Sequence, residues 1–121
     1  MKAVIKACEY YNHTGIIVER GKKYLAEISG KWTDLIYSCG PEGYSSPNFY
    51  MKWMEHLKRH TQAPWFALIA TIDCKQLDFH LMPEIFTAKA SGEIVCYAND
   101  VPFMYWNNFG SLTLNVSEIT G

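Results

Sequence analysis

The stretch that decides the fold runs from residue 92 to residue 117 and reads GEIVCYANDVPFMYWNNFGSLTLNVS. Near its end, Leu112, Leu114 and Val116 alternate with polar residues, which is the period-two pattern of a strand with one buried face. The segment Gly92–Ala98 carries β-branched and aromatic residues and predicts a second strand before the loop. The stretch therefore predicts two strands joined by a polar and aromatic loop.

Short β-branched and aromatic runs recur along the rest of the chain at spacings typical of sandwiches. They predict strands at Lys2–Cys8, Gly15–Glu19, Tyr24–Ser29, Trp65–Asp73 and Glu84–Lys89, in addition to Gly92–Ala98 and Ser111–Ser117. No repeat, low-complexity tract or linker interrupts the 121 residues, which predicts a single domain spanning residues 1–121. The expected fold class is all-β, a small sandwich.

One segment departs from this pattern and predicts a short helix at about residues 47–60. Ser46 is expected to cap the helix, with Pro47 at the first helical position. Phe49, Trp53 and Leu57 then recur every four residues, and this stripe is interpreted as core packing. The charged residues of the segment are expected to form a solvated face, and they are Lys52, Glu55, Lys58, Arg59 and His60. Core positions are also expected for Trp32, Trp53 and Trp65.

The composition allows a core, with 49% hydrophobic and 15% aromatic residues. A formal net charge of -1 excludes the basic footprint of a nucleic-acid-binding protein. No run is long enough to span a bilayer, and Lys6 interrupts the only apolar run near the start, so no secretory signal is expected. We therefore expect no nucleic-acid partner, no membrane insertion and a cytoplasmic origin. A role outside the cell or on its surface would need a non-classical route of release.

The four cysteines, Cys8, Cys39, Cys74 and Cys96, are widely spaced and include no CxxC pair. Such spacing is typical of free or buried thiols rather than of a disulfide framework or a zinc site. One alternative is an enzyme with Cys39 as nucleophile and one of the four histidines as base. The histidines and carboxylates form no catalytic pattern, so the chain is expected not to be an enzyme and no catalytic residue is predicted.

The loop after residue 98 gathers hard oxygen donors in a short stretch. Asp100 supplies a carboxylate, Asn107 and Asn108 supply amide oxygens, and a backbone carbonyl near Met104 can add another. Calcium selects such mixed oxygen ligands, although the EF-hand pattern is absent. The alternative is that these residues form two turns in which the side chains bond to their own backbone. By composition alone, the turn interpretation is favoured over the metal site.

A family resemblance favours the metal site. The YNDVPGxYGNNSGS loop of the LecA-like (PA-I type) galactophilic bacterial lectins resembles Tyr97-Ala98-Asn99-Asp100-Val101-Pro102, followed by Tyr105, Asn107-Asn108 and Gly110-Ser111. The family's G-W and G-P-x-G segment resembles Gly30-Lys31-Trp32 and Gly40-Pro41-Glu42-Gly43. The resemblance implies a jelly-roll-like β-sandwich of two antiparallel sheets and one Ca²⁺ per subunit. It also implies glycan partners with terminal galactose-like residues, and a homo-oligomer, either a dimer or a tetramer.

The resemblance also implies site residues. Calcium would be held by the side chains of Asp100, Asn107 and Asn108 and by the carbonyl of Met104. A further carbonyl would come from Leu35, by spacing from Trp32, or from Tyr37, by residue type, and the sequence does not decide between them. The implied sugar contacts are Asp100, Val101, Met104, Asn107, Asn108 and Tyr50.

The chain departs from the family where the sugar's hydroxymethyl group is held. The family's histidine and glutamine fall on Pro47 and Tyr50, and the small loop residues are replaced by Phe103 and Trp106. Trp106 and its neighbour Tyr105 are expected either to face a sugar or to have a structural role, in which they close the end of the sandwich or make a subunit contact. The alternative function is therefore a structural or interaction protein that keeps the lectin fold with an altered or lost sugar site.

Overall fold

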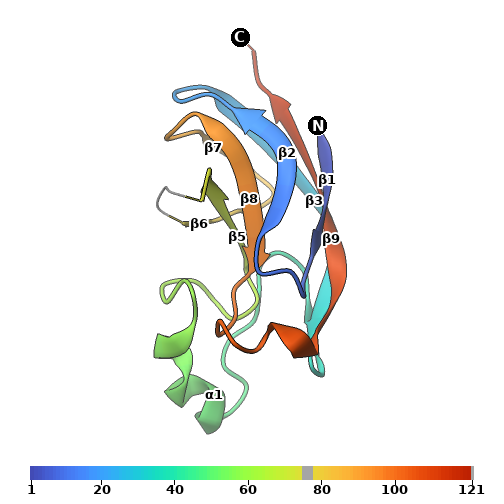
Figure 1. Cartoon of the computed structure of the whole chain (residues 1–121), viewed down its shortest axis with the longest axis vertical. Coiled ribbons are helices and arrows are strands. Elements are labelled where there is room, and N and C mark those ends of the chain that lie inside the picture. Colours follow the sequence, from blue (N-terminus) through green and yellow to red (C-terminus); the bar gives the residue numbers. More distant parts are fainter. Residues whose placement is uncertain (75–77, 121) are drawn as a thin grey trace.

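The computed structural model describes residues 1–74 and 78–120 and is a sandwich of two antiparallel β-sheets (Figure 1). One sheet has the strand order β1-β9-β3-β4, with β7 also paired to β3, and the other has the order β2-β8-β5-β6. The strands are β1 (Lys2–Lys6), β2 (Asn12–Val18), β3 (Lys23–Asp34), β4 (Tyr37–Cys39), β5 (Leu68–Ile72), β6 (Phe79–His80), β7 (Ile85–Thr87), β8 (Gly92–Ala98) and β9 (Asn108–Glu118). The helical parts are α1 (Phe49–Trp53) and 3-10 turns at Glu55–Leu57 and Tyr105–Asn107. The predicted fold class is confirmed.

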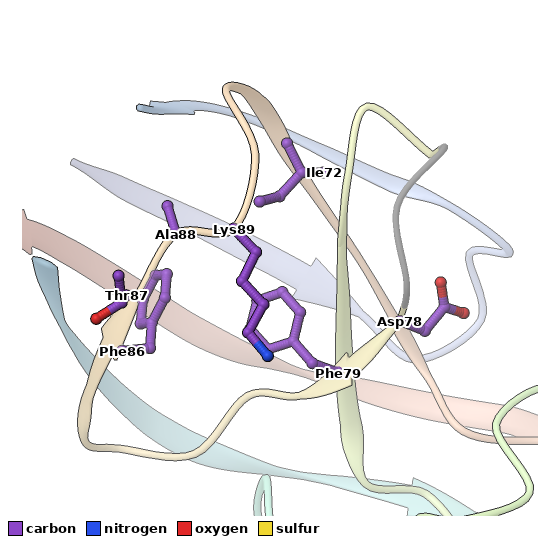
Figure 2. Close-up of a pocket in the computed structure, with 7 residues that line it drawn as sticks. All are labelled: Ile72, Asp78, Phe79, Phe86, Thr87, Ala88 and Lys89. Atoms are coloured by element: carbon purple, nitrogen blue, oxygen red, sulfur yellow. The ribbon is translucent and has the colours of Figure 1, made fainter. Parts of the chain in front are cut away.

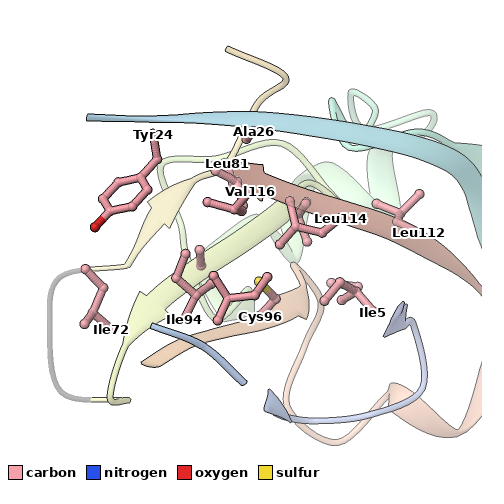
Figure 3. Packing of buried hydrophobic residues seen from close by; sticks show 14 of the residues in the cluster. Ile5, Tyr24, Ala26, Ile72, Leu81, Ile94, Cys96, Leu112, Leu114 and Val116 are labelled. Atoms are coloured by element: carbon pink, nitrogen blue, oxygen red, sulfur yellow. The ribbon is translucent and has the colours of Figure 1, made fainter. Parts of the chain in front are cut away.

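Strand β9 lies between β1 and β3 and supplies much of the core. Its predicted alternation is confirmed, because Leu112, Leu114 and Val116 are fully buried. Figure 3 shows these side chains in one cluster with Ile94 and Cys96 of β8, which belongs to the other sheet. The two strands of the deciding stretch therefore face each other across the sandwich.

Strand β3 is longer than the predicted strand Tyr24–Ser29. It passes through Gly30, which has a φ of 99° and whose added Cβ would lie 3.1 Å from the backbone oxygen of Ser111. Glycine has no Cβ and tolerates this conformation, so the strand continues. The extension places Trp32 and, two residues later, Asp34 on the inward face, and Trp32 is fully buried as predicted.

Strand β5 is buried along its whole length. Its inward residues join the main core, whereas Ile69 forms a second cluster with Ala63, Ala67 and Tyr97. The chain before β5 therefore covers the outer face of this sheet. Trp65 in that segment is 3% exposed, as predicted for a core tryptophan.

The helix is shorter than predicted and begins later. Asn48 caps α1, because its side-chain oxygen accepts the backbone N–H of Met51 at 2.9 Å. The predicted cap at Ser46 and the first helical position at Pro47 are therefore wrong. Ser46 instead donates its hydroxyl to Glu55 and accepts the indole N–H of Trp65 at 2.8 Å. Within the described residues, no helix has both the length and the apolar character needed to cross a bilayer.

The interpretation of the helix stripe as core packing is wrong. Phe49 is 85% exposed and Trp53 is 64% exposed, so Trp53 is not a core residue either. The reason is the position of α1, which stands at one end of the sandwich instead of lying across a sheet (Figure 1). None of the residues of this five-residue helix is buried.

The predicted solvated face is also wrong at two positions. Lys58 is 6% exposed, and its ammonium donates to the backbone oxygen of Ala63 at 2.8 Å. Arg59 places its guanidinium 3.6 Å from the ring centre of Tyr10 and 3.4 Å from that of Tyr97. Both cations therefore pack the segment that follows α1 against the sandwich.

Candidate metal centre

The loop that joins β8 to β9 crosses from one sheet to the other at the end where α1 lies (Figure 1). It buries the three predicted ligand side chains, since Asp100 is 3% exposed, Asn107 6% and Asn108 3%. The Arg59 backbone N–H donates to the Asp100 carbonyl at 3.1 Å and holds the start of the loop. Three polar side chains that usually favour water are thus placed inside the protein.

Three side-chain oxygens in this loop are buried without a hydrogen-bond partner among the described residues, and they are Asp100 Oδ2, Asn107 Oδ1 and Asn108 Oδ1. The Asn108 amide nitrogen donates to the Ala7 carbonyl at 3.1 Å, which fixes the orientation of that amide. A buried acceptor left without a partner costs about 1–3 kcal/mol, so three such acceptors in one loop call for a ligand that binds oxygen.

The oxygen donors of the loop are better explained by binding to a hard cation than by two turns. In that interpretation the side chains bond to their own backbone, but only Asp100 Oδ1 does so, accepting the Val101 N–H at 2.7 Å. In the described part of the chain, no three histidine, cysteine, aspartate or glutamate side chains gather as a metal cluster. A mixture of carboxylate and amide oxygens is what calcium prefers.

The structure brings Asp34 to this site, which the sequence analysis missed. Asp34 is 7% exposed and pairs with Asn108 across β3 and β9. Directly opposite residues of an antiparallel pair point to the same face, so both side chains point inward. Burial, and then the nearby Asp34 carboxylate, raises the pKa of Asp100 to about 7. The signal available in the sequence was the spacing of two from the buried Trp32.

The β3–β4 hairpin brings both predicted carbonyl donors to the same place. Asp34 pairs with Tyr37, which leaves Leu35 and Ile36 as the turn. The Leu35 N–H donates to the Asn107 carbonyl at 3.1 Å, so this turn is fastened to the loop. Leu35 and Tyr37 both line the neighbouring cavity, and the choice between their carbonyls stays a prediction.

A cavity of about 260 Å³ opens beside the buried oxygens. Five of the six predicted sugar contacts line it, and they are Asp100, Val101, Met104, Asn107 and Tyr50. Asn108 is not among the lining residues. The lining also includes the apolar side chains of Leu35, Ile36, Met51, Met54 and Trp65.

Of the remaining loop residues, some are hydrogen-bonded within the protein and one is exposed to solvent. The Val101 N–H already donates to Asp100, and the Val101 carbonyl accepts the Met104 N–H at 3.0 Å. Tyr105 is buried, donates to the Ala98 carbonyl and accepts from Arg59, so it closes the end of the sandwich. Trp106 is 74% exposed and does not line the cavity.

A larger cavity of about 420 Å³ lies elsewhere, lined by residues from β5, β6 and β7 and from the chain next to β6 and β7 (Figure 2). Its lining is mostly apolar and consists of Ile72, Asp78, Phe79, Phe86, Thr87, Ala88 and Lys89. None of the three buried oxygens without a partner belongs to it. The smaller cavity is therefore the better candidate, because Asp100 and Asn107, which carry two of these oxygens, line it.

The state of the four cysteines does not support a cysteine nucleophile. All four are free, with Cys39 and Cys96 buried and Cys8 and Cys74 exposed, which confirms the prediction of free thiols. Burial, with a contribution from Glu42, raises the pKa of the Cys39 thiol to about 11. A nucleophilic cysteine needs a lowered pKa, so Cys39 does not have the properties of a catalytic thiol.

The fold has a counterpart among solved structures. A chain titled "EclA N-terminal domain; PllA-like lectin" matches with a TM-score of 0.72 and 14% sequence identity, covering 98% of this chain and 95% of that chain. No family model and no curated protein matches the sequence. At this identity the likeness establishes a lectin-like β-sandwich fold along nearly the whole chain.

Proposed function

We propose that this protein is a calcium-dependent, non-enzymatic carbohydrate-binding lectin. The observation that carries the proposal is the set of three buried oxygens without a partner, on Asp100, Asn107 and Asn108, beside a cavity. The solved structure of similar fold is a lectin domain, which supports the same function. The proposed ligands are glycans that end in galactose-like residues with cis hydroxyls.

Each residue has a defined role in this proposal. Asp100 contributes negative charge, and Asn107 and Asn108 contribute neutral oxygens that are already dehydrated. The Met104 carbonyl and a carbonyl from Leu35 or Tyr37 complete the protein's share of ligands. When bound, calcium supplies a centre that two vicinal hydroxyl oxygens can coordinate.

The affinity of a single site for one sugar should be modest, because a small polar ligand buries little surface when it binds. Several sites in one assembly would raise the overall avidity, and a homo-oligomer, either a dimer or a tetramer, fits this need. Exposed apolar residues are available for subunit contacts at the end where the site lies, and they include Phe49, Trp53, Phe103 and Trp106.

The proposal is tested by unfolding the protein with calcium and with chelator. A ligand that binds only the folded state at about 100 times its Kd raises the free energy of unfolding by about 2.7 kcal/mol. A glycan array run with calcium and with chelator then identifies the sugar. A protein indifferent to calcium in both assays would support the alternative of a lectin fold without a sugar site.

Tyr50 is expected to contribute to sugar binding and not to metal binding. Its ring is 67% exposed and lines the cavity from α1, where it can pack against the C–H face of a sugar. Tyr50→Ala should weaken sugar binding by about three- to tenfold. Calcium affinity, measured by calorimetry, should stay unchanged. Lys52→Ala, at an exposed position of the same helix and outside the cavity lining, is the matched control, and an equal loss in both variants would contradict the role of Tyr50.

Calcium affinity should fall as the pH is lowered. The raised pKa of Asp100, about 7 in the metal-free protein, means that its carboxyl is mostly protonated at more acidic pH. Calcium needs the ionised form, so binding below that pH releases a proton, and the affinity should fall about tenfold for each pH unit. Calorimetric titrations at about pH 5.5, 6.5 and 7.5 measure this slope. An affinity independent of pH over this range would contradict it.

A further inference from the structure

Asp34 lies at the end of β3, and it belongs to none of the salt bridges between described residues. It is 7% exposed, and burial raises its pKa. Among the described residues, the side-chain hydrogen bond that Asp34 accepts comes from the Tyr44 hydroxyl, which donates to Oδ2 at 2.7 Å. A neutral hydroxyl offsets part of the desolvation of a carboxylate but brings no positive charge.

The described residues around Asp34 add further negative charge and no positive charge. Asp34 and Asp100 line the same cavity, and no lysine, arginine or histidine is among the residues that line it. Asp34 also pairs with Asn108, whose Oδ1 is one of the three buried oxygens without a partner. Two carboxylates and two amide oxygens thus lie together at a cavity whose lining, among the described residues, includes no lysine, arginine or histidine.

We propose that Asp34 is a second carboxylate ligand of the metal, so that the site carries two negative charges and matches a divalent cation. This inference rests on the proposed function and extends it, because the LecA-like pattern implies one carboxylate only. Two carboxylates neutralise a divalent ion, and a site with higher ligand charge binds calcium more tightly. The ion in turn relieves the repulsion between Asp34 and Asp100.

The test uses Asp34→Asn, which keeps the shape and removes the charge, in the full chain. Calorimetry with calcium alone should show an affinity at least about tenfold weaker than that of the unchanged protein. Thermal unfolding in chelator should show a midpoint that rises by a few degrees, because one of two facing carboxylates is gone. A merely structural role would not produce these two opposite changes together.

Two matched variants complete the test. Tyr44→Phe removes the hydrogen bond to Asp34 and keeps the charge, so its calcium affinity should change by less than about threefold. Glu42→Gln removes a nearby carboxylate that does not line the cavity, and it should leave the affinity unchanged. Equal losses in Asp34→Asn and Tyr44→Phe would overturn the inference, as would unchanged binding in Asp34→Asn. If the unchanged protein itself binds no calcium, the proposed function fails together with the inference.

Discussion

Asp100→Ala is expected to abolish calcium-dependent sugar binding and to weaken calcium binding by about a hundredfold or more. The substitution removes a charged ligand and one of the three buried oxygens without a partner. Loss of residues that merely orient ligands already costs about 10- to 100-fold in metal affinity, so loss of a ligand itself should cost at least as much. Calorimetric titration of metal-stripped protein with calcium, followed by a glycan-binding assay, measures both effects.

Asn107→Ala separates loss of the metal from damage to the loop. Asp100 also accepts the Val101 N–H, so its removal disturbs the backbone. Asn107 Oδ1 has no partner within the described protein, and its removal breaks no such bond. We therefore expect Asn107→Ala to lose calcium and sugar binding with little change of stability in chelator. Glu27→Ala, an exposed carboxylate on β3, is the neutral control. Calcium-dependent sugar binding retained in either site variant would refute the site.

The parts of the fold that the sequence predicted are those where a β-branched and aromatic run or a period-two pattern is long. Strand β8 has the predicted bounds Gly92–Ala98, and the predicted strand Ser111–Ser117 lies inside β9. Strands β4 and β6 have three and two residues, which is too short for any period to show. They exist because neighbouring strands pair with them, and that tertiary context is absent from a local pattern.

The candidate site was predictable where one loop carries it and was missed where two distant segments meet. Asp100, Asn107 and Asn108 lie within nine residues of one another, so the local composition points to them. Asp34 lies on a different strand, beyond Gly30, where the hydrophobic alternation stops. Only the pairing of β3 with β9 shows that Asp34 and Asn108 are neighbours. The prediction that the helix aromatics are buried was wrong for a related reason. Periodicity shows that they share one face of the helix, but it does not show whether that face packs on a sheet.

Asn99 is expected to be the residue outside the main core whose loss destabilises the fold most. It is fully buried, and its amide nitrogen donates to the carbonyls of His60, Ala63 and Pro64 at 2.9, 3.2 and 2.9 Å. Its side-chain oxygen accepts the His60 N–H at 2.9 Å. One side chain thus satisfies the backbone of the segment that covers the outer face of β5.

Asn99→Ala should lower the free energy of unfolding by about 3–5 kcal/mol, because it leaves several buried backbone groups without partners. Denaturant unfolding in chelator measures this loss without any contribution from metal binding. Asn115→Ala on β9, where the side chain is partly exposed and contacts Glu27, should change the stability by less than about 0.5 kcal/mol. Asn99→Asp keeps the acceptor for the His60 N–H but loses the donors to three carbonyls, so it should be nearly as unstable as Asn99→Ala. If both Asn99 variants unfold within about 1 kcal/mol of the unchanged protein, the covering segment is held by its apolar contacts and not by this amide.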